Sequence, residues 1–380
     1  MIQDPVAIFF IMAFIVILSL WLERSVPFLK KMGSASLCII MGIILSNSTI
    51  IPGESPVYDF LMSEAVTASI VLILLSVSIK SLQMAGSTML KAFLVGSIGS
   101  ALGGITMSYV LNDAIGPESW KLAGQFTGTY IGGGMNFAAL GNAFQTTSSL
   151  FTAGIAADVI LTAIWLIICL AAPLLLGSKE KATPLPEEDT STEDKPKTLE
   201  KALYNSLKAI PIQDMAAFTG ITIGCMLGSD LLAEWMPFLP KILWLTTLAL
   251  LMGQLPVVRQ LSGGAMLGNY LLLLFLASNG AKSVVANIVA VGPAIFYFAL
   301  GTIFIHGIFI FGVGKLLKID AAILAVASQA NVGGSSSALA LASARGYGDL
   351  VLPGVAVGLL GYAVGNYLGF FVGNMMQGIL

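Results

Sequence analysis

The chain has 380 residues, of which 57% are apolar and only 10% are charged, and its formal net charge is −2. An average soluble domain carries charge on about a quarter of its residues, so this composition excludes an ordinary water-exposed surface and predicts an all-α, polytopic membrane protein embedded in a lipid bilayer. The small net charge gives no support to nucleic-acid binding. The sequence also lacks a nucleotide-binding loop, zinc-ligand spacing and a nucleophile elbow, so we expect neither an enzyme nor a cofactor.

Apolar runs of about 20 residues, the length that crosses a bilayer as a helix, predict about ten membrane spans. Two of them, 32–46 and 236–255, are the weakest because they are short or flanked by proline. The predicted spans are 5–22, 32–46, 57–79, 88–111 and 149–176 in the first half, and 211–228, 236–255, 262–281, 287–314 and 350–378 in the second.

Two further apolar stretches, 119–147 and 319–346, each contain a glycine cluster near the middle, where a helix is expected to break. Each stretch lies between the fourth and fifth spans of its half. This matching order predicts a twofold repeat of 1–176 and 211–380, joined by a linker at 177–210.

The linker 177–210 changes character along its length. Its polar, proline-containing part at 179–197 predicts a flexible tether. Apolar residues then recur at helical spacing from Leu199 to Ile210. This spacing predicts either a short helix on the cytoplasmic membrane surface or an ordinary helical linker.

The distribution of Lys and Arg bears on whether the two glycine stretches cross the membrane. If each is a re-entrant hairpin, fifteen basic residues share one side and three lie on the other; if both cross as broken helices, the count is eight against ten. Because cytoplasmic loops are enriched in Lys and Arg, the count favours hairpins. Five spans per half is an odd number, so the second half enters the membrane with the opposite orientation and the repeat is inverted. Both termini then lie outside the inner (plasma) membrane, and the linker lies in the cytoplasm.

The two glycine clusters predict a solute-binding site. Irregular backbone at membrane depth occurs where it is buried in protein or lines a polar cavity, and paired broken helices of inverted repeats mark transport sites. Short helices restarting at 135–143 and 335–343 would present unpaired N–H groups to an anion. Close helix packing is the alternative explanation, and it is preferred for the glycines of 96–104. The predicted substrate-binding residues are Gly132, Gly133, Gly134, Asn136, Asn331, Gly333, Gly334, Ser335, Ser336 and Ser337.

Asp158 is an ionisable residue at predicted membrane depth, where such residues commonly serve transport. It could bind Na⁺ together with oxygens of Thr127, Thr129 or Gln329, or it could carry a proton. A structural hydrogen bond to a helix end is the third explanation. For His306, the single histidine of the chain, packing is favoured over proton relay.

The motifs Gly132-Gly-Gly-Met-Asn136 and Asn331-Val-Gly-Gly-Ser-Ser-Ser337 resemble an uncharacterised membrane family, domain-of-unknown-function family 819. That family is grouped with the Na⁺/H⁺-antiporter-like and bile-acid-transporter-like folds. The arrangement is also similar to the glutamate:Na⁺ symporters and the 2-hydroxycarboxylate symporters. The resemblance implies a homodimer in which a mobile core carries both glycine hairpins past a static scaffold, an elevator movement coupled to Na⁺ or H⁺.

The chain departs from these relatives at two places. The glutamate symporters carry a His where Met135 or Asn136 stands here, and the adjacent acidic pair of electrogenic antiporters is missing because Ala157 precedes Asp158. We therefore expect an ion-coupled secondary transporter of a small organic anion. The alternatives are a cation/proton antiporter that uses Asp158 and a non-transporting membrane receptor or scaffold.

Overall fold

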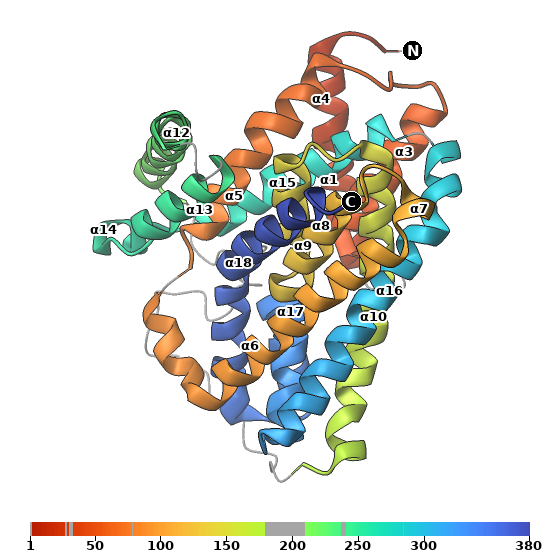
Figure 1. Cartoon of the computed structure of the whole chain (residues 1–380). Helices are drawn as coiled ribbons and strands as arrows, with labels where there is room; N and C mark the ends of the chain where they lie inside the picture. Colours follow the sequence, from red (N-terminus) through yellow and green to blue (C-terminus); the bar gives the residue numbers. More distant parts are fainter. Residues whose placement is uncertain are drawn as a thin grey trace.

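The computed structural model describes residues 2–26, 29, 33–77, 79–178, 210–236, 241–283 and 285–380. Over these residues the secondary structure is helical, and no β-strand occurs in them (Figure 1). The predicted tether at 179–197 and nearly all of the predicted surface helix that begins at Leu199 lie outside the described residues.

The helices of the first half begin where the sequence supplies starting signals. Asp4 caps the first helix by accepting a hydrogen bond from the Ala7 N–H at 2.8 Å, and Pro5 occupies the first helical position, where its missing N–H costs nothing. The elements of this half are α1 (Pro5–Ser25), α3 (Gly33–Asn47), α4 (Pro56–Phe60), the π-helical turn η1 (Leu61–Ala65), α5 (Val66–Leu74), α6 (Ile79–Val110), α7 (Asn112–Ile115), α8 (Ser119–Gly132), α9 (Gly134–Ala143) and α10 (Ser148–Leu176).

The second half follows a similar order of long and short helices. Asp320 caps its glycine-containing helix by accepting from the Ala322 N–H at 2.8 Å. The elements of this half are α12 (Ile212–Trp235), α13 (Lys241–Met252), α14 (Pro256–Gln260), α15 (Gly264–Lys282), α16 (Val285–Leu316), α17 (Ala321–Ala344) and α18 (Gly348–Gln377).

Eight helices within the described residues are long and apolar enough to cross a membrane, which makes this a membrane protein with multiple apolar helices. They correspond to eight of the ten spans expected from the sequence. The two weakest expected spans, 32–46 and 236–255, correspond to shorter apolar helices, Ser34–Asn47 and Lys241–Met252.

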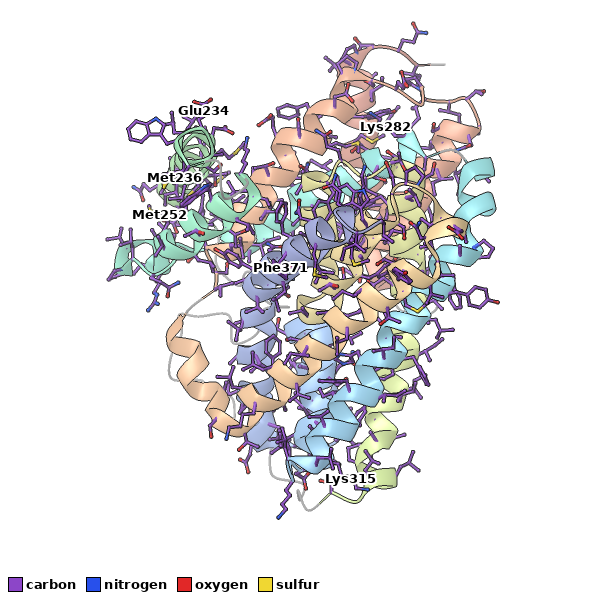
Figure 2. The ribbon with its side chains drawn as sticks, in the orientation of Figure 1. Glu234, Met236, Met252, Lys282, Lys315 and Phe371 are labelled. Atoms are coloured by element: carbon purple, nitrogen blue, oxygen red, sulfur yellow. The ribbon has the colours of Figure 1, made fainter. Side chains whose placement is uncertain are left out.

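The long helices run between two ends of the molecule. Lys282, at the end of α15, and Lys315, in the last turn of α16, lie at opposite ends (Figure 2). The sequence-based charge count likewise assigns these two lysines to opposite sides of the membrane. In Figure 1, α6, α8, α10, α16, α17 and α18 form a central group, while α12, α13 and α14 lie at one edge. Helix α12 of this edge group packs against α13 and against α5, and α13 also contacts α18.

Helix α18 packs against α8 at backbone distance through facing glycines. A Cβ built on Gly124 would lie 2.6 Å from the Gly369 carbonyl oxygen, and one on Gly365 would lie 2.6 Å from the Gly128 carbonyl oxygen. A Cβ would have no room at this distance, so only glycine lets the two helices approach this closely. The facing pairs are Gly124 with Gly369, Gly128 with Gly365, and Gly132 with Gly361.

The glycines of 96–104 also serve helix packing, in agreement with the sequence-based preference. On α6, a Cβ on Gly103 would lie 2.6 Å from the Thr302 carbonyl oxygen of α16. A Cβ on Gly104 would lie 2.8 Å from the Ala123 carbonyl oxygen of α8. Helix α6 is thereby held between α8 and α16.

We expect Gly365→Ala to destabilise the protein by about 1–3 kcal/mol, because the added methyl group overpacks the α8–α18 contact. The matched control is Gly224→Ala, on α12, where a Cβ would meet nothing within 4 Å. Relief of glycine's backbone entropy should leave that variant unchanged or stabilised by about 0.5–1 kcal/mol. Thermal unfolding of the purified proteins measures both, and equal melting temperatures for the two variants would contradict the packing argument.

Candidate functional site

The first glycine stretch forms a helical hairpin. The chain reverses at Gly133, whose φ of 88° and ψ of 174° suit glycine far better than a residue with a side chain. Asn136 Nδ2 donates to the Gly128 carbonyl oxygen at 3.0 Å, close to the turn. Lys121 Nζ donates to the Gln145 carbonyl oxygen at 3.0 Å, at the opposite end of the pair. The helices α8 and α9 are therefore antiparallel neighbours along their length.

The second glycine stretch also returns to the end from which it starts. Its break is at Gly334, with a φ of 76°. At its beginning, Ser178 Oγ donates to Asp320 Oδ1 at 2.5 Å. At its end, the Arg345 guanidinium donates to the Leu170 carbonyl oxygen. Leu170 lies in the C-terminal part of α10, and Ser178 follows that helix directly. The two arms of α17, which precede and follow Gly334, therefore share that end of the molecule.

The two hairpins approach from opposite ends of α10 and meet at their tips. The base of the first lies at the start of α10, where the Thr147 N–H donates to Glu118 Oε2 at 3.2 Å. A Cβ built on Gly133 would lie 3.4 Å from the Gly334 Cα. Asn331 Nδ2 reaches across to the Ile131 carbonyl oxygen at 3.4 Å. The structure therefore brings both predicted glycine clusters into direct contact.

The residues predicted to bind substrate differ in their accessibility. Gly134 is exposed, and Gly333, Ser336 and Ser337 are half-buried, so these four form the accessible surface of the tips. The buried members of the set are Gly132, Gly133, Asn136, Asn331, Gly334 and Ser335.

Two of the buried members have structural hydrogen bonds. Both hydrogens of the Asn136 amide are used, one by the Gly128 carbonyl oxygen and the other by the Gly361 carbonyl oxygen at 3.0 Å. Asn331 Nδ2 donates to Ser97 Oγ at 3.1 Å as well as to the opposite tip. These amide groups hold the tips in place, so their N–H groups are not available to a solute.

Asp158 lies beside the first tip. Its side chain is 9% exposed, and a Cβ built on Gly134 would lie 3.7 Å from its Oδ2. Its other carboxylate oxygen, Oδ1, accepts a hydrogen bond from Thr162 Oγ1 at 3.2 Å. The carboxylate is thus positioned between α10 and the accessible part of the first hairpin.

The other predicted ion ligands are buried polar groups whose oxygens have no hydrogen-bond partner among the described residues. This holds for Thr127 Oγ1, Thr129 Oγ1 and both polar atoms of the Gln329 amide. Within those residues no hydrogen bond links them to Asp158. Buried polar groups almost always have partners, so these groups are candidates for contact with an ion or an ordered water. The same property is shared by Tyr130 Oη and Asn331 Oδ1.

His306 has partners for both ring nitrogens, which fits the packing role favoured from the sequence. Nδ1 lies 2.9 Å from the Gly96 carbonyl oxygen and Nε2 lies 2.9 Å from Ser328 Oγ. Because a carbonyl can only accept, Nδ1 carries the proton and Nε2 accepts from Ser328. Trp165 Nε1 in turn donates to Ser328 Oγ at 2.9 Å. The network ties α10, α16 and the first arm of α17 to α6.

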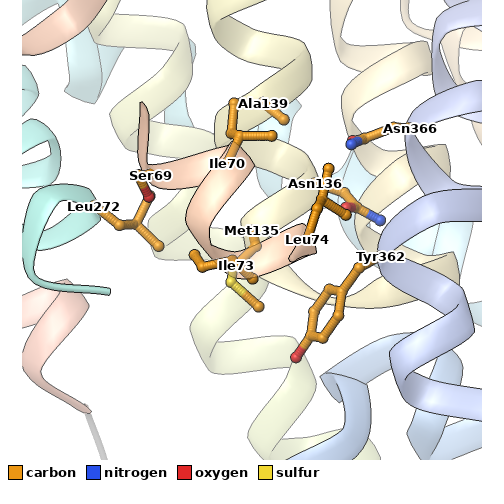
Figure 3. A pocket seen from close by; sticks show the side chains of 10 residues that line it. All are labelled: Ser69, Ile70, Ile73, Leu74, Met135, Asn136, Ala139, Leu272, Tyr362 and Asn366. Atoms are coloured by element: carbon orange, nitrogen blue, oxygen red, sulfur yellow. The ribbon is translucent and has the colours of Figure 1, made fainter. Parts of the chain in front are cut away.

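A pocket adjoins the tips on the side that faces α5 and α15. It is small, with a cavity volume of about 20 Å³, and is lined by ten residues of α5, α9, α15 and α18 (Figure 3). Met135 and Asn136 line it from the first tip, while the hydroxyl of Tyr362 lies 3.4 Å from Ser335 Oγ of the second tip. Sequence reasoning missed Tyr362, because only the packing of α18 on both hairpins brings it here.

Comparison with known proteins places the chain in a family. It is 29% identical over 374 residues to a protein of Bacillus subtilis (strain 168) named "Uncharacterized membrane protein YjcL", and the alignment covers 95% of this chain and 94% of that protein. The sequence model of the family "Protein of unknown function (DUF819)" matches residues 7–379. The chain therefore belongs to the DUF819 family of membrane proteins.

Proposed function

We propose that the protein is a secondary transporter that moves a small organic anion together with Na⁺ or H⁺. The observation that carries this proposal is the contact between two broken hairpins that enter from opposite ends of α10. Broken backbone at membrane depth is stable only where protein or a polar cavity receives it. Paired broken helices that meet midway are the arrangement in which transporters bind their solutes.

An inverted repeat of 1–176 and 211–380 is part of this proposal, and matching helix contacts support it. Helix α6 packs on α16, and α5 packs on α15, as pairs related by a twofold axis would. In the proposed repeat, α6 corresponds to α16, α8 to α17 and α10 to α18. The contact of α6 with α18 is then matched by that of α16 with α10, and the contact of α8 with α18 by that of α17 with α10. The repeat then comprises ten spans with one hairpin per half.

The anion-binding part of the site is the start of α9. Its N-cap residue, Gly133, supplies no side chain to the first N–H groups of the helix. Such groups carry partial positive charge and attract anions without a basic side chain. The accessible residues Gly134, Ser336 and Ser337 would contact the solute here.

Asp158 gives a physical reason for ion coupling. An anion at the tips would lie near the Asp158 carboxylate, and two negative charges roughly 5 Å apart at an effective dielectric constant near 20 repel by about 3 kcal/mol. Na⁺ or a proton on Asp158 removes this repulsion. The anion and the cation therefore favour each other's binding, which is the thermodynamic basis of symport.

Alternating access would follow from the position of the pocket. It lies between α5 and α15 on one side and α9 and α18 on the other. We assign α6, α8 to α10 and α16 to α18 to a moving core, and the remaining spans to a scaffold that forms a homodimer. The core would carry the tips past α5 and α15 in an elevator movement, with the termini outside the inner membrane and residues 177–210 in the cytoplasm.

A cation/proton antiporter that uses Asp158 is the alternative function. It is favoured by the unpaired oxygens of Thr127, Thr129 and Gln329, which are neutral ligands of the kind that Na⁺ accepts. The two functions differ in one respect: the antiporter has no organic substrate. A non-transporting membrane receptor or scaffold would move neither ions nor organic solutes across the membrane.

We expect Gly133→Ala to weaken anion binding by about tenfold to a hundredfold, because alanine at a φ of 88° costs about 1–3 kcal/mol and this strain favours a different backbone conformation at the tip. Gly116→Ala is the matched control: Gly116 has the same φ of 88° but no neighbouring atom within 4 Å of an added Cβ. Binding is measured as the rise in melting temperature across a panel of organic anions in Na⁺ buffer. Equal binding by both variants would contradict a role for the tips.

We expect Asp158→Asn to remove the dependence of anion binding on Na⁺ or pH, because the neutral amide no longer repels the solute. The control variant is Asp113→Asn, a carboxylate at the exposed end of α7. Melting temperatures with and without Na⁺, at two pH values, give the readout for each variant. A coupling ion that still strengthens anion binding after the Asp158 substitution would assign the coupling to other residues.

A further inference from the structure

The last carbonyl groups of α8 depend on side chains of other helices. A helix leaves its final carbonyl oxygens without intrahelical N–H partners. Among the described residues, no backbone N–H group bonds to the carbonyl oxygen of Tyr130 or of Ile131. Ser100 Oγ of α6 donates to the Tyr130 carbonyl oxygen, and Asn331 Nδ2 of α17 donates to that of Ile131 at 3.4 Å. The first tip is therefore held in place by donors from α6 and α17.

His306 determines which group receives the single hydroxyl hydrogen of Ser100. Besides the Tyr130 carbonyl oxygen, Ser100 Oγ lies 3.1 Å from the Gly96 carbonyl oxygen and 3.0 Å from His306 Nδ1. Nδ1 carries a proton, because it also lies 2.9 Å from the Gly96 carbonyl oxygen, which can only accept. This N–H is shared between Gly96 and Ser100 Oγ, so the serine keeps its own hydrogen for Tyr130.

The other ring nitrogen of His306 connects to the second hairpin. Nε2 accepts a hydrogen bond from Ser328 Oγ, on the first arm of α17, at 2.9 Å. Three residues later on the same arm, Asn331 Nδ2 donates to Ser97 Oγ of α6 at 3.1 Å. All four side chains are buried, so bulk water does not compete for these bonds. One imidazole ring thus connects the supports of both tips.

We propose that His306 is a positioning residue for the solute site. This inference rests on the proposed function, in which the start of α9 binds the anion. The ring acts on the first tip through Ser100: its Nδ1–H directs the serine hydroxyl to the carbonyl group of Tyr130, three residues before the reversal at Gly133. This bond holds the end of α8, and with it the first N–H groups of α9, in the geometry that receives the solute.

Two substitutions separate the roles of the ring nitrogens. The amide of asparagine reaches about as far as Nδ1, and that of glutamine about as far as Nε2. His306→Asn therefore keeps an N–H for Gly96 and Ser100 but loses the acceptor for Ser328. His306→Gln keeps the acceptor and loses the N–H. A residue that only fills space would make the two variants alike, whereas a positioning role predicts that the first tip responds to glutamine alone.

The test is hydrogen exchange of the backbone amides at 133–136, measured by mass spectrometry on the purified full-length protein. We expect exchange there to be about tenfold faster in His306→Gln and in Ser100→Ala, because each loses a buried hydrogen bond that holds the tip. In His306→Asn it should stay near the wild-type rate. The matched control is Ser108→Ala, also buried on α6, whose Oγ donates to the Ile105 carbonyl oxygen of its own helix at 2.9 Å.

Equal exchange rates in the asparagine and glutamine variants would overturn the proposal. So would a wild-type rate in Ser100→Ala, or an equal rise in Ser108→Ala. If His306→Gln does not fold, the comparison of Ser100→Ala with Ser108→Ala decides the question by itself.

Anion binding is measured separately, as the rise in melting temperature with acetate, succinate or citrate in Na⁺ buffer. We expect affinity to be about tenfold lower in His306→Gln than in His306→Asn. Faster exchange at the tip with unchanged affinity would contradict a role of His306 in the solute site. If none of these anions stabilises even the wild-type protein, the proposed anion symport fails for this panel, while the exchange rates still show whether His306 holds the tip.

Discussion

The close approach of α18 to both hairpins is the constraint on which the rest of the molecule depends. Gly361, Gly365 and Gly369 face the first hairpin at backbone distance. Towards the N-terminal end of α18, a Cβ on Gly358 would lie 2.6 Å from the Ser335 backbone nitrogen at the second tip, and one on Gly354 would contact Val326. In lipid, helices associate through packing rather than through the hydrophobic effect, so contact this close supplies the stability that a broken helix needs.

This packing fixes the position of the tips without using the groups that the proposed solute would contact. The amide hydrogens of Asn136 and the carbonyl oxygens of α8 and α18 bond to each other, so the buried part of the first tip is rigid. The accessible part keeps the uncapped start of α9, with Asp158 beside it. In the proposed transporter, rigid placement of one partial positive charge and one carboxylate would make cation and anion binding mutually dependent, because each changes the electrostatic energy of the other.

Much of this arrangement follows from the sequence alone, and the missing part has a definite physical cause. The helix breaks at Gly133 and Gly334 were predictable, because glycine clusters inside apolar stretches disfavour a continuous helix. The sequence shows that Asp158 lies well inside a predicted span, but it does not show which groups surround its side chain. Its place beside a tip was therefore only one of the possibilities that the sequence allowed. The two weakest predicted spans correspond to apolar helices that are shorter than the eight long ones among the described residues.

Side chains contributed by distant helices could not be predicted. Ser69 of α5 and Tyr362 of α18 reach the site only through tertiary packing, which no local pattern encodes. The spacing of Gly361, Gly365 and Gly369 four residues apart is visible in the sequence, but their partner helix is not. The roles of Asn136 and Asn331 also depend on tertiary contacts. The sequence does not distinguish an amide that is free to bind a solute from one whose hydrogen bonds are used inside the protein.

The most direct test of the central claim is the accessibility of the tips from each side of the membrane. A cysteine is placed at the half-buried tip residue by Ser336→Cys, with the buried Cys38, Cys169 and Cys225 replaced by Ala. The protein is reconstituted in liposomes and treated with a membrane-impermeant thiol reagent, from outside or from the lumen. Alternating access predicts modification from both sides. Modification from one side alone, under all solute and ion conditions, would contradict the account.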